Sequence, residues 1–253
     1  MSCYLAVDTA TDAGSVAVGA PGEPYAAVAI GKRRHGTSLV PAIAEVLRLA
    51  GVEPRGLSGV VVADGPGSFT GLRIGFATVK GILLECDHLS LTTIPSLLAA
   101  VWGVLQIDPA PAAALYDALR GEVFGAVYGL EAGRVRIELE PCLGSIESLC
   151  ERSPVRPWIA LGDGAVRQRE AVERWTGRAP LEHPIGMPQA AALLHLLDVA
   201  GAASRVDDVQ RFEPAYGRQA EAQARWERNH GVPLASELAA NKAPEVKPKQ
   251  GSQ

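Results

Sequence analysis

Apolar runs of strand length alternate with helical apolar–polar patterns along the first hundred residues. Three strands are predicted at 3–8, 15–19 and 25–30, and a Pro-Gly turn between the last two favours a hairpin. Periods of three to four residues then predict a helix at 38–50, stopped by Gly51. A buried strand at 59–63, a helix at 71–85, a strand at 89–94 and a helix at 96–105 complete this half.

The same order starts again after a proline-rich segment at 109–111. Strands are predicted at 112–116, 122–128, 134–140 and 158–161, and helices at 145–151, 165–175 and 188–200. Three antiparallel strands followed by α/β crossovers, occurring twice, are typical of the actin-like ATPase class, whose unit resembles ribonuclease H. We therefore predict an α/β fold with a duplicated βββαβα unit and a reduced second half.

Domain boundaries follow from this order. An N-terminal ribonuclease-H-like subdomain is predicted at 1–108 and a C-terminal subdomain at 109–234, with a last helix able to return to the first subdomain. Residues 235–253 are rich in Pro, Lys and small polar residues, so a disordered tail is expected there.

Charge, cysteine content and hydropathy indicate in which cell compartment the protein works and which partners it lacks. The net charge of −4 gives no general attraction to nucleic acid. The four cysteines are scattered without a CxxC pair, which favours a reducing cytosol over a disulfide framework. The start MSCYLAVD is strand-like rather than a signal peptide, and no window predicts a membrane span. A cytoplasmic protein without membrane contact is expected.

Two neighbouring segments could contact a phosphate. Asp8 ends the first predicted strand and Thr9 follows it. In actin-like ATPases a carboxylate at this place handles the metal–nucleotide, although an Asp that caps a turn explains the same residue. The loop GPGSFTG at 65–71 precedes a helix whose first N–H groups could bind an anion. It is neither a P-loop nor GxGxxG, so tight turning is the alternative. The residues of this possible vestigial nucleotide loop are Asp8, Thr9, Gly65, Gly67, Ser68 and Thr70.

Other chemistry has little support in the sequence. The histidines show neither HxxxH nor HExxH spacing, so no metal site is predicted. Ser68 does not stand in the GxSxG context of a hydrolase nucleophile, and nothing marks a base. We predict no catalytic residue and no cofactor, with weak nucleotide binding at most.

The helices at 38–50 and 71–85 are apolar over nearly their whole circumference. One face of each must pack on the sheet, and a second apolar face is costly in water unless something covers it. The chain's own C-terminal helix could do so, but we favour a partner. The predicted interface residues are Leu39, Ile43, Val46, Leu47, Gly71, Leu72, Gly75, Val79 and Ile82, and we expect Gly75 to lie on the outward face.

The chain resembles the TsaB (YeaZ) family of tRNA threonylcarbamoyladenosine biosynthesis proteins over roughly residues 3–230. The resemblance rests on LAVDTAT at 5–11, on His35 with Leu39 and Pro41, and above all on DGPGSFTGLRIGFATVKG at 64–81. Weaker matches are YDALRGEVFGAVY at 116–128, GDGA at 162–165 and PAYGRQAEA at 214–222. Leu119 stands where the family usually has an arginine, which puts any role of that arginine in doubt.

The resemblance implies a partner-dependent role. TsaB proteins pair with the catalytic paralogue TsaD, or with themselves when alone, and work with the ATPase TsaE. Together they transfer a threonylcarbamoyl group to the adenosine beside the anticodon of ANN-reading tRNAs, so tRNA would be met through the complex. The histidine pair that holds the metal in TsaD would fall near Ser96 and Ala100, neither of which can replace it.

Three functional hypotheses follow. The first is a non-catalytic subunit of that transferase complex, with the two apolar helices as its interface. The second is an independent actin-like ATPase or sugar-kinase-like enzyme, favoured by Asp8 and the glycine loop. The third is a peptidase, for which no triad or metal motif speaks.

Overall fold

The first sheet contains the N-terminal half of the chain and one late strand. The computed structural model describes residues 2–32, 34–187 and 189–217. The strands of this sheet are β1 (Tyr4–Asp8), β2 (Gly14–Ala20), β3 (Glu23–Ile30), β4 (Gly59–Ala63), β5 (Ser90–Ile94) and β10 (Ser204–Val206), in the order β10-β5-β4-β1-β2-β3. β4 pairs in parallel with β1 and β5, and the remaining pairs are antiparallel. β4 is buried throughout, as its valine run predicts for a strand covered on both faces.

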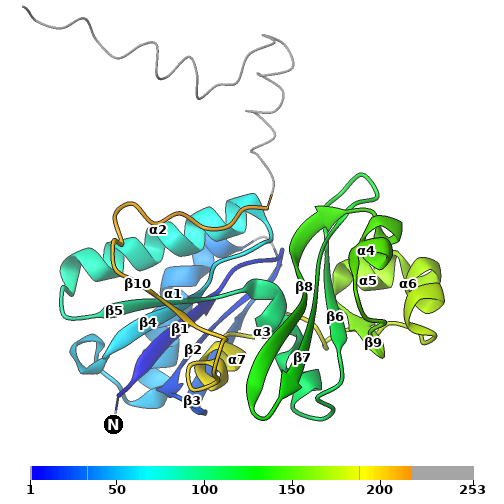
Figure 1. Cartoon of the computed structure of the whole chain (residues 1–253). Coiled ribbons are helices and arrows are strands. Elements are labelled where there is room, and N and C mark those ends of the chain that lie inside the picture. Colours follow the sequence, from blue (N-terminus) through cyan, green and yellow to red (C-terminus); the bar gives the residue numbers. More distant parts are fainter. Residues whose placement is uncertain (1, 33, 188, 218–253) are drawn as a thin grey trace, which may run out of the picture. The chain divides into compact units, whose positions relative to one another are not determined.

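Helices cover both faces of this sheet (Figure 1). α1 (His35–Ala50) and α2 (Phe69–Glu85) pack on one face and on each other, around the core that includes Val60 and Val62. α3 (Ser96–Leu105) and α7 (Ala190–Leu196) belong to the core on the other face. The Ser68 hydroxyl caps α2 by accepting from the Gly71 amide, and α1 ends at Gly51 in the left-handed conformation.

The second sheet repeats part of the first. Its strands are β6 (Ala112–Asp117), β7 (Val123–Glu131), β8 (Arg134–Gly144) and β9 (Ile159–Leu161), in the order β8-β7-β6-β9, with β6 and β9 parallel. α3 and α7 share one core with this sheet and the first, so they lie between the two. α4 (Ile146–Arg152), α5 (Asp163–Arg167) and α6 (Arg169–Thr176) form a separate core with its other face.

The predicted fold class is confirmed, and most predicted elements are present. The helix expected at 165–175 is two helices that meet at Gln168, and the helix expected at 188–200 spans only α7. The prediction missed β10 and the short 3-10 turn η1 (Pro54–Gly56). Among the described residues, the second sheet has no strand that corresponds to β5. The domain boundaries stay predictions, and the tail expected at 235–253 lies outside the described residues.

Residues 207–217, which we call the C-terminal strap, run along α2 after β10 (orange in Figure 1). Phe212 stacks on Phe76 with ring centroids 5.5 Å apart, and Tyr216 contacts Phe69 at 4.6 Å. The Lys80 ammonium donates to the Gln210 carbonyl at 3.1 Å. The strap therefore covers part of the apolar surface of α2 with the chain's own residues.

Candidate functional site

Asp8 lies at the carboxyl end of β1, where the predicted nucleotide site begins, but it is fully buried. Its Oδ1 accepts from the Ala10 amide at 3.0 Å, and the Gln189 backbone also stabilises the charged carboxylate. Burial raises the pKa of Asp8 to about 6, although the bond from Ala10 favours the charged form. The N-terminus of α7 closes over the same region, since the Ala190 amide donates to the Ser15 hydroxyl at 2.7 Å. The Asp8 carboxylate therefore has no exposed surface at which a metal–nucleotide could contact it.

The glycine loop uses its backbone donors within the fold. The Ser68 amide donates to the Ala10 carbonyl at 2.6 Å, and the Gly65 amide donates to the Ser96 hydroxyl at 2.9 Å. A Cβ on Gly67 would collide with the Ala10 carbonyl, and one on Gly65 would collide with the Ala215 carbonyl of the strap. Tight packing therefore explains both glycines, and these amides are not free to hold a phosphate.

The two remaining loop positions differ from each other. The Ser68 hydroxyl accepts from the Gly71 amide as the helix cap, while Thr70 is exposed on the first turn of α2. Thr9 is buried beside Asp8, and its Oγ1 has no hydrogen-bond partner among the described residues. The structure thus brings the predicted residues together around one turn, but as a packed contact between β1 and α2.

The predicted interface side chains face inward. Five of them are buried in the core between α1, α2 and the sheet: Leu39, Ile43, Val46, Leu47 and Val79. Leu72 is buried in the other core, which also contains Ala10 and Ala63. Gly71 and Gly75 are also buried, and a Cβ on either would collide with Thr9. The expectation that Gly75 lies on an outward face is therefore wrong, because α2 uses its glycine side to approach the turn after β1. Of the predicted set, Ile82 alone is partly exposed.

Other residues of the same helices do face outward. The outward stripe of α1 contains Gly36, Val40 and Ala44, and that of α2 contains Ile74, Ala77 and Gly81, with Ile74 partly exposed and the others exposed. We call these six residues the α1–α2 outer face. Val40 is 63% exposed, and nothing lies within 4 Å of a Cβ built on Gly81. Leu84 extends the stripe at 72% exposure. The interface itself stays a prediction, now carried by different side chains.

The second sheet has two neighbouring carboxylates, Asp117 and Asp163, that were not predicted as site residues. Asp117 ends β6 as Asp8 ends β1. The Asp117 amide donates to Oδ1 of Asp163 at 2.9 Å, and the Asp117 Oδ2 pairs with Arg167 at 2.9 Å. Burial raises the pKa of Asp163, and the nearby negative charge of Asp117 raises it further. The hydrogen bond from the Asp117 amide acts in the opposite direction. The GDGA segment was the available signal, because it follows a strand as the Asp64–Gly65 loop does. Leu119, at the family's arginine position, is 60% exposed with a φ of 65°.

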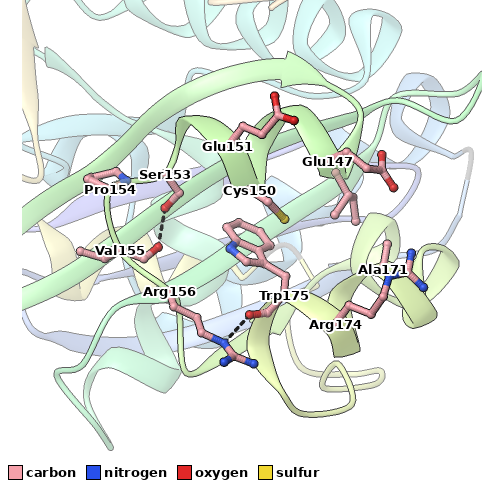
Figure 2. A pocket seen from close by; sticks show the side chains of 11 residues that line it. Glu147, Cys150, Glu151, Ser153, Pro154, Val155, Arg156, Ala171, Arg174 and Trp175 are labelled. Atoms are coloured by element: carbon pink, nitrogen blue, oxygen red, sulfur yellow. Dashed lines mark hydrogen bonds between the residues drawn. The ribbon is translucent and has the colours of Figure 1, made fainter.

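An open depression of about 610 Å³ lies between α4, α6 and the segment that joins α4 to β9 (Figure 2). Trp175, Cys150 and Val155 are among its apolar lining residues, while Glu147 and Arg174 stand at its rim. Burial raises the pKa of the Cys150 thiol, which disfavours its thiolate form. None of the predicted site residues lines this depression, and its mixed charges do not define a reaction.

The described residues contain no group of side chains suited to binding a metal ion. Within those residues no three His, Cys, Asp or Glu side chains are grouped to hold a metal ion. Ser96 and Ala100, the positions expected for the metal-binding histidines of TsaD, are buried in α3, and Ser96 bonds the glycine loop. No described helix is both long and apolar enough to span a bilayer.

Fold and site together define a protein of the actin-like ATPase class whose nucleotide-site region is packed shut. Residues 29–173 match the family model described as TsaD, tRNA N6-adenosine threonylcarbamoyltransferase, and this is more than half of the chain. The chain belongs to this family, and within it to the TsaB (YeaZ) proteins.

Individual relatives agree with this assignment. The tRNA threonylcarbamoyladenosine biosynthesis protein TsaB of Bacillus subtilis (strain 168) is 29% identical over 77% of this chain and 84% of its own length. The TsaB of Escherichia coli (strain K12) is 33% identical over 49% of this chain and 54% of its own. A Pseudomonas aeruginosa crystal structure, of an uncharacterized protein with similarity to peptidase YEAZ, aligns with a TM-score of 0.69 at 28% identity, covering 86% of this chain and 100% of that one.

Proposed function

We propose that the protein is a non-catalytic subunit of the complex that makes threonylcarbamoyladenosine in tRNA. With TsaD and TsaE it would support transfer of the threonylcarbamoyl group to the adenosine beside the anticodon of ANN-reading tRNAs. Its relatives are named as biosynthesis proteins of this modified nucleoside. The catalytic metal and the transfer step would belong to TsaD.

One observation carries this proposal: the elements of an ATPase site are used for packing, while an apolar helix face stays uncovered. Asp8 is sealed, and the loop amides of Gly65 and Ser68 are bonded within the chain. The strap covers one side of α2, yet the α1–α2 outer face stays open among the described residues. If a partner covers this face, burial of its apolar surface contributes about 25 cal/mol per Å² to the free energy of binding, before the costs of association are subtracted.

The experiment replaces a glycine on the outer face and measures assembly. Gly81→Arg places a long charged side chain in the proposed contact, whereas a Cβ there meets nothing in the free chain, so folding should be retained. We expect loss of TsaD binding by more than about tenfold, because an unpaired buried charge costs several kcal/mol. Reconstituted tRNA modification should fall in parallel.

Gly103→Arg is the matched control. Gly103 is also an exposed helical glycine with nothing within 4 Å of its Cβ, but it lies on α3. This variant should bind TsaD as the wild type does. Wild-type assembly by folded Gly81→Arg would show that the α1–α2 outer face is not the interface.

A further inference from the structure

The C-terminal strap covers one side of α2 (Figure 1). Phe69, Phe76 and Lys80 follow one another at intervals of seven and four residues, so they lie along the same side of the helix. We call these three residues the strap side of α2. The strap rings of Phe212 and Tyr216 contact the two phenylalanines, and the strap main chain accepts from Lys80. Phe76 is only 3% exposed in this arrangement.

The α1–α2 outer face is too small to form a stable contact by itself. It has six residues, and four of them are glycine or alanine. A stable interface usually buries about 800 Å² on each partner, from about 20–30 residues. A partner on the outer face must therefore extend onto the surface beside it. The strap side is one such surface, because Ala77 and Gly81 of the outer face directly follow Phe76 and Lys80 along the helix.

A partner gains more by replacing the strap than by covering it. Most strap residues are exposed, and the exposed ones are mainly polar or charged: Asp207, Asp208, Gln210, Arg211 and Glu213. A partner that covered the strap would have to desolvate these groups, which costs free energy unless each forms a new hydrogen bond. A partner that replaces the strap instead contacts the rings of Phe69 and Phe76, which offer a large apolar area.

The strap is held weakly enough to be displaced. None of residues 207–217 is in a helix or strand, and Pro214 is the only buried residue among them. Besides the two ring contacts and the bond from Lys80, the Ala215 amide donates to the Asp64 carbonyl at 2.7 Å. Segments with few buried contacts and an exposed main chain open locally while the rest of the protein stays folded.

We propose that the strap is an autoinhibitory cover. It closes the strap side of α2 in the free chain, and it is displaced when the partner that docks on the α1–α2 outer face extends across the helix. This inference rests on the proposed function, because TsaD is taken as that partner. The apparent affinity for TsaD is then reduced by the fraction of chains in which the strap is open, so loosening the strap strengthens assembly.

Titration of the full-length chain with TsaD tests the competition. Phe212→Ala removes the ring that stacks on Phe76, so it favours the open strap and leaves α2 itself unchanged. We expect the dissociation constant for TsaD to fall about threefold to tenfold, which corresponds to the loss of one aromatic pair. Tyr216→Ala should act in the same direction, because it removes the contact with Phe69. Tyr25→Ala, which removes an exposed ring on β3, is the control and should have no effect.

Hydrogen exchange with and without TsaD reports on the strap directly. In the free chain the Ala215 amide should exchange by local opening, faster than the amides of the buried strand β4, and TsaD should accelerate this exchange. Slower exchange at Ala215 in the complex would mean that the partner covers the strap in place, and it would overturn the proposal. So would exchange in the free chain as slow as that of β4.

The outcomes for the strap and for the proposed function can be told apart. If TsaD binds the wild type but binds Phe212→Ala and Tyr216→Ala no more tightly, the strap is not inhibitory, while the proposed subunit role stands. If TsaD binds neither the wild type nor the variants, both the subunit role and the inhibition by the strap are wrong. Should one variant unfold by circular dichroism, the other variant and the hydrogen exchange decide.

Discussion

Gly75 provides a sharp test of how α2 packs on the turn after β1. In Gly75→Ala the new Cβ would collide with Thr9 Oγ1, and Thr9 Cβ and Cγ2 lie 3.5 Å away. Thr9 is 1% exposed, so its side chain has little room to rotate away. Overpacking of this kind costs about 1–3 kcal/mol, while replacing a helical glycine by alanine gains about 1 kcal/mol. We expect a net loss of about 1 kcal/mol in the free energy of unfolding.

The matched variants separate these two contributions. Gly81→Ala and Gly103→Ala add a Cβ where nothing lies within 4 Å, so each should gain up to about 1 kcal/mol. In a Thr9→Ala background the collision with Oγ1 is removed, and Gly75→Ala should then become stabilising. The coupling energy of this double-mutant cycle should be about 2 kcal/mol.

The assay is urea unfolding followed by circular dichroism, with midpoints compared at equal slope so that a change in the compactness of the unfolded state is excluded. Stabilisation of the wild-type background by Gly75→Ala, equal to that by Gly81→Ala, would refute the reasoning. So would a coupling energy near zero.

Three further predictions concern chemistry and pH. The isolated chain should form no threonylcarbamoyladenosine in tRNA, as measured by mass spectrometry of digested nucleosides, and robust transfer with stoichiometric metal would contradict the proposed role. ATP should bind weakly in calorimetry; sub-micromolar affinity that is lost in Asp8→Ala would favour the ATPase hypothesis. Because burial raises the pKa of Asp8 and of Asp64 to about 6, the folded state binds their protons more tightly than the unfolded state does. Stability should therefore fall as pH rises from about 4 to 6. Asp8→Asn should remove part of this fall, on the order of 3 kcal/mol, and an unchanged pH profile of the urea midpoint would disprove this.

Periodicity and turn residues were sufficient to predict the order of the main elements. The valine run of β4 and the stop of α1 at Gly51 depend on neighbouring residues alone, and the structure has both elements where these residues predict them. β10 is only three residues long and follows α7 in the sequence, far from β5. Its pairing with β5 therefore depends on tertiary contacts that no local pattern encodes. The same holds for the strap, which has neither helical nor strand periodicity.

The outward face of α2 could not be predicted for a related reason. A helix that is apolar all round gives no sign of which side meets the sheet, and the glycines could belong to any contact. The structure assigns Gly75 to Thr9 and leaves Gly81 open, although both are helical glycines in the same motif. The chemistry of the loop was equally ambiguous, because an Asp and several glycines suit a packed turn as well as a phosphate. His35 fits the packed turn, since its Nε2 lies 2.8 Å from the Thr11 carbonyl.

The late position of α7 and β10 in the chain has a consequence for synthesis on the ribosome. The face of the first sheet that bears Ala6 and Val61 shares its core with Leu193 and Leu196, and β5 gains its outer neighbour only at Ser204–Val206. A nascent chain that has emerged only as far as the second sheet must keep this apolar surface exposed. Completion of the first half therefore waits for nearly the last described residues, and a stalled or truncated chain would present a natural target for chaperones and proteases.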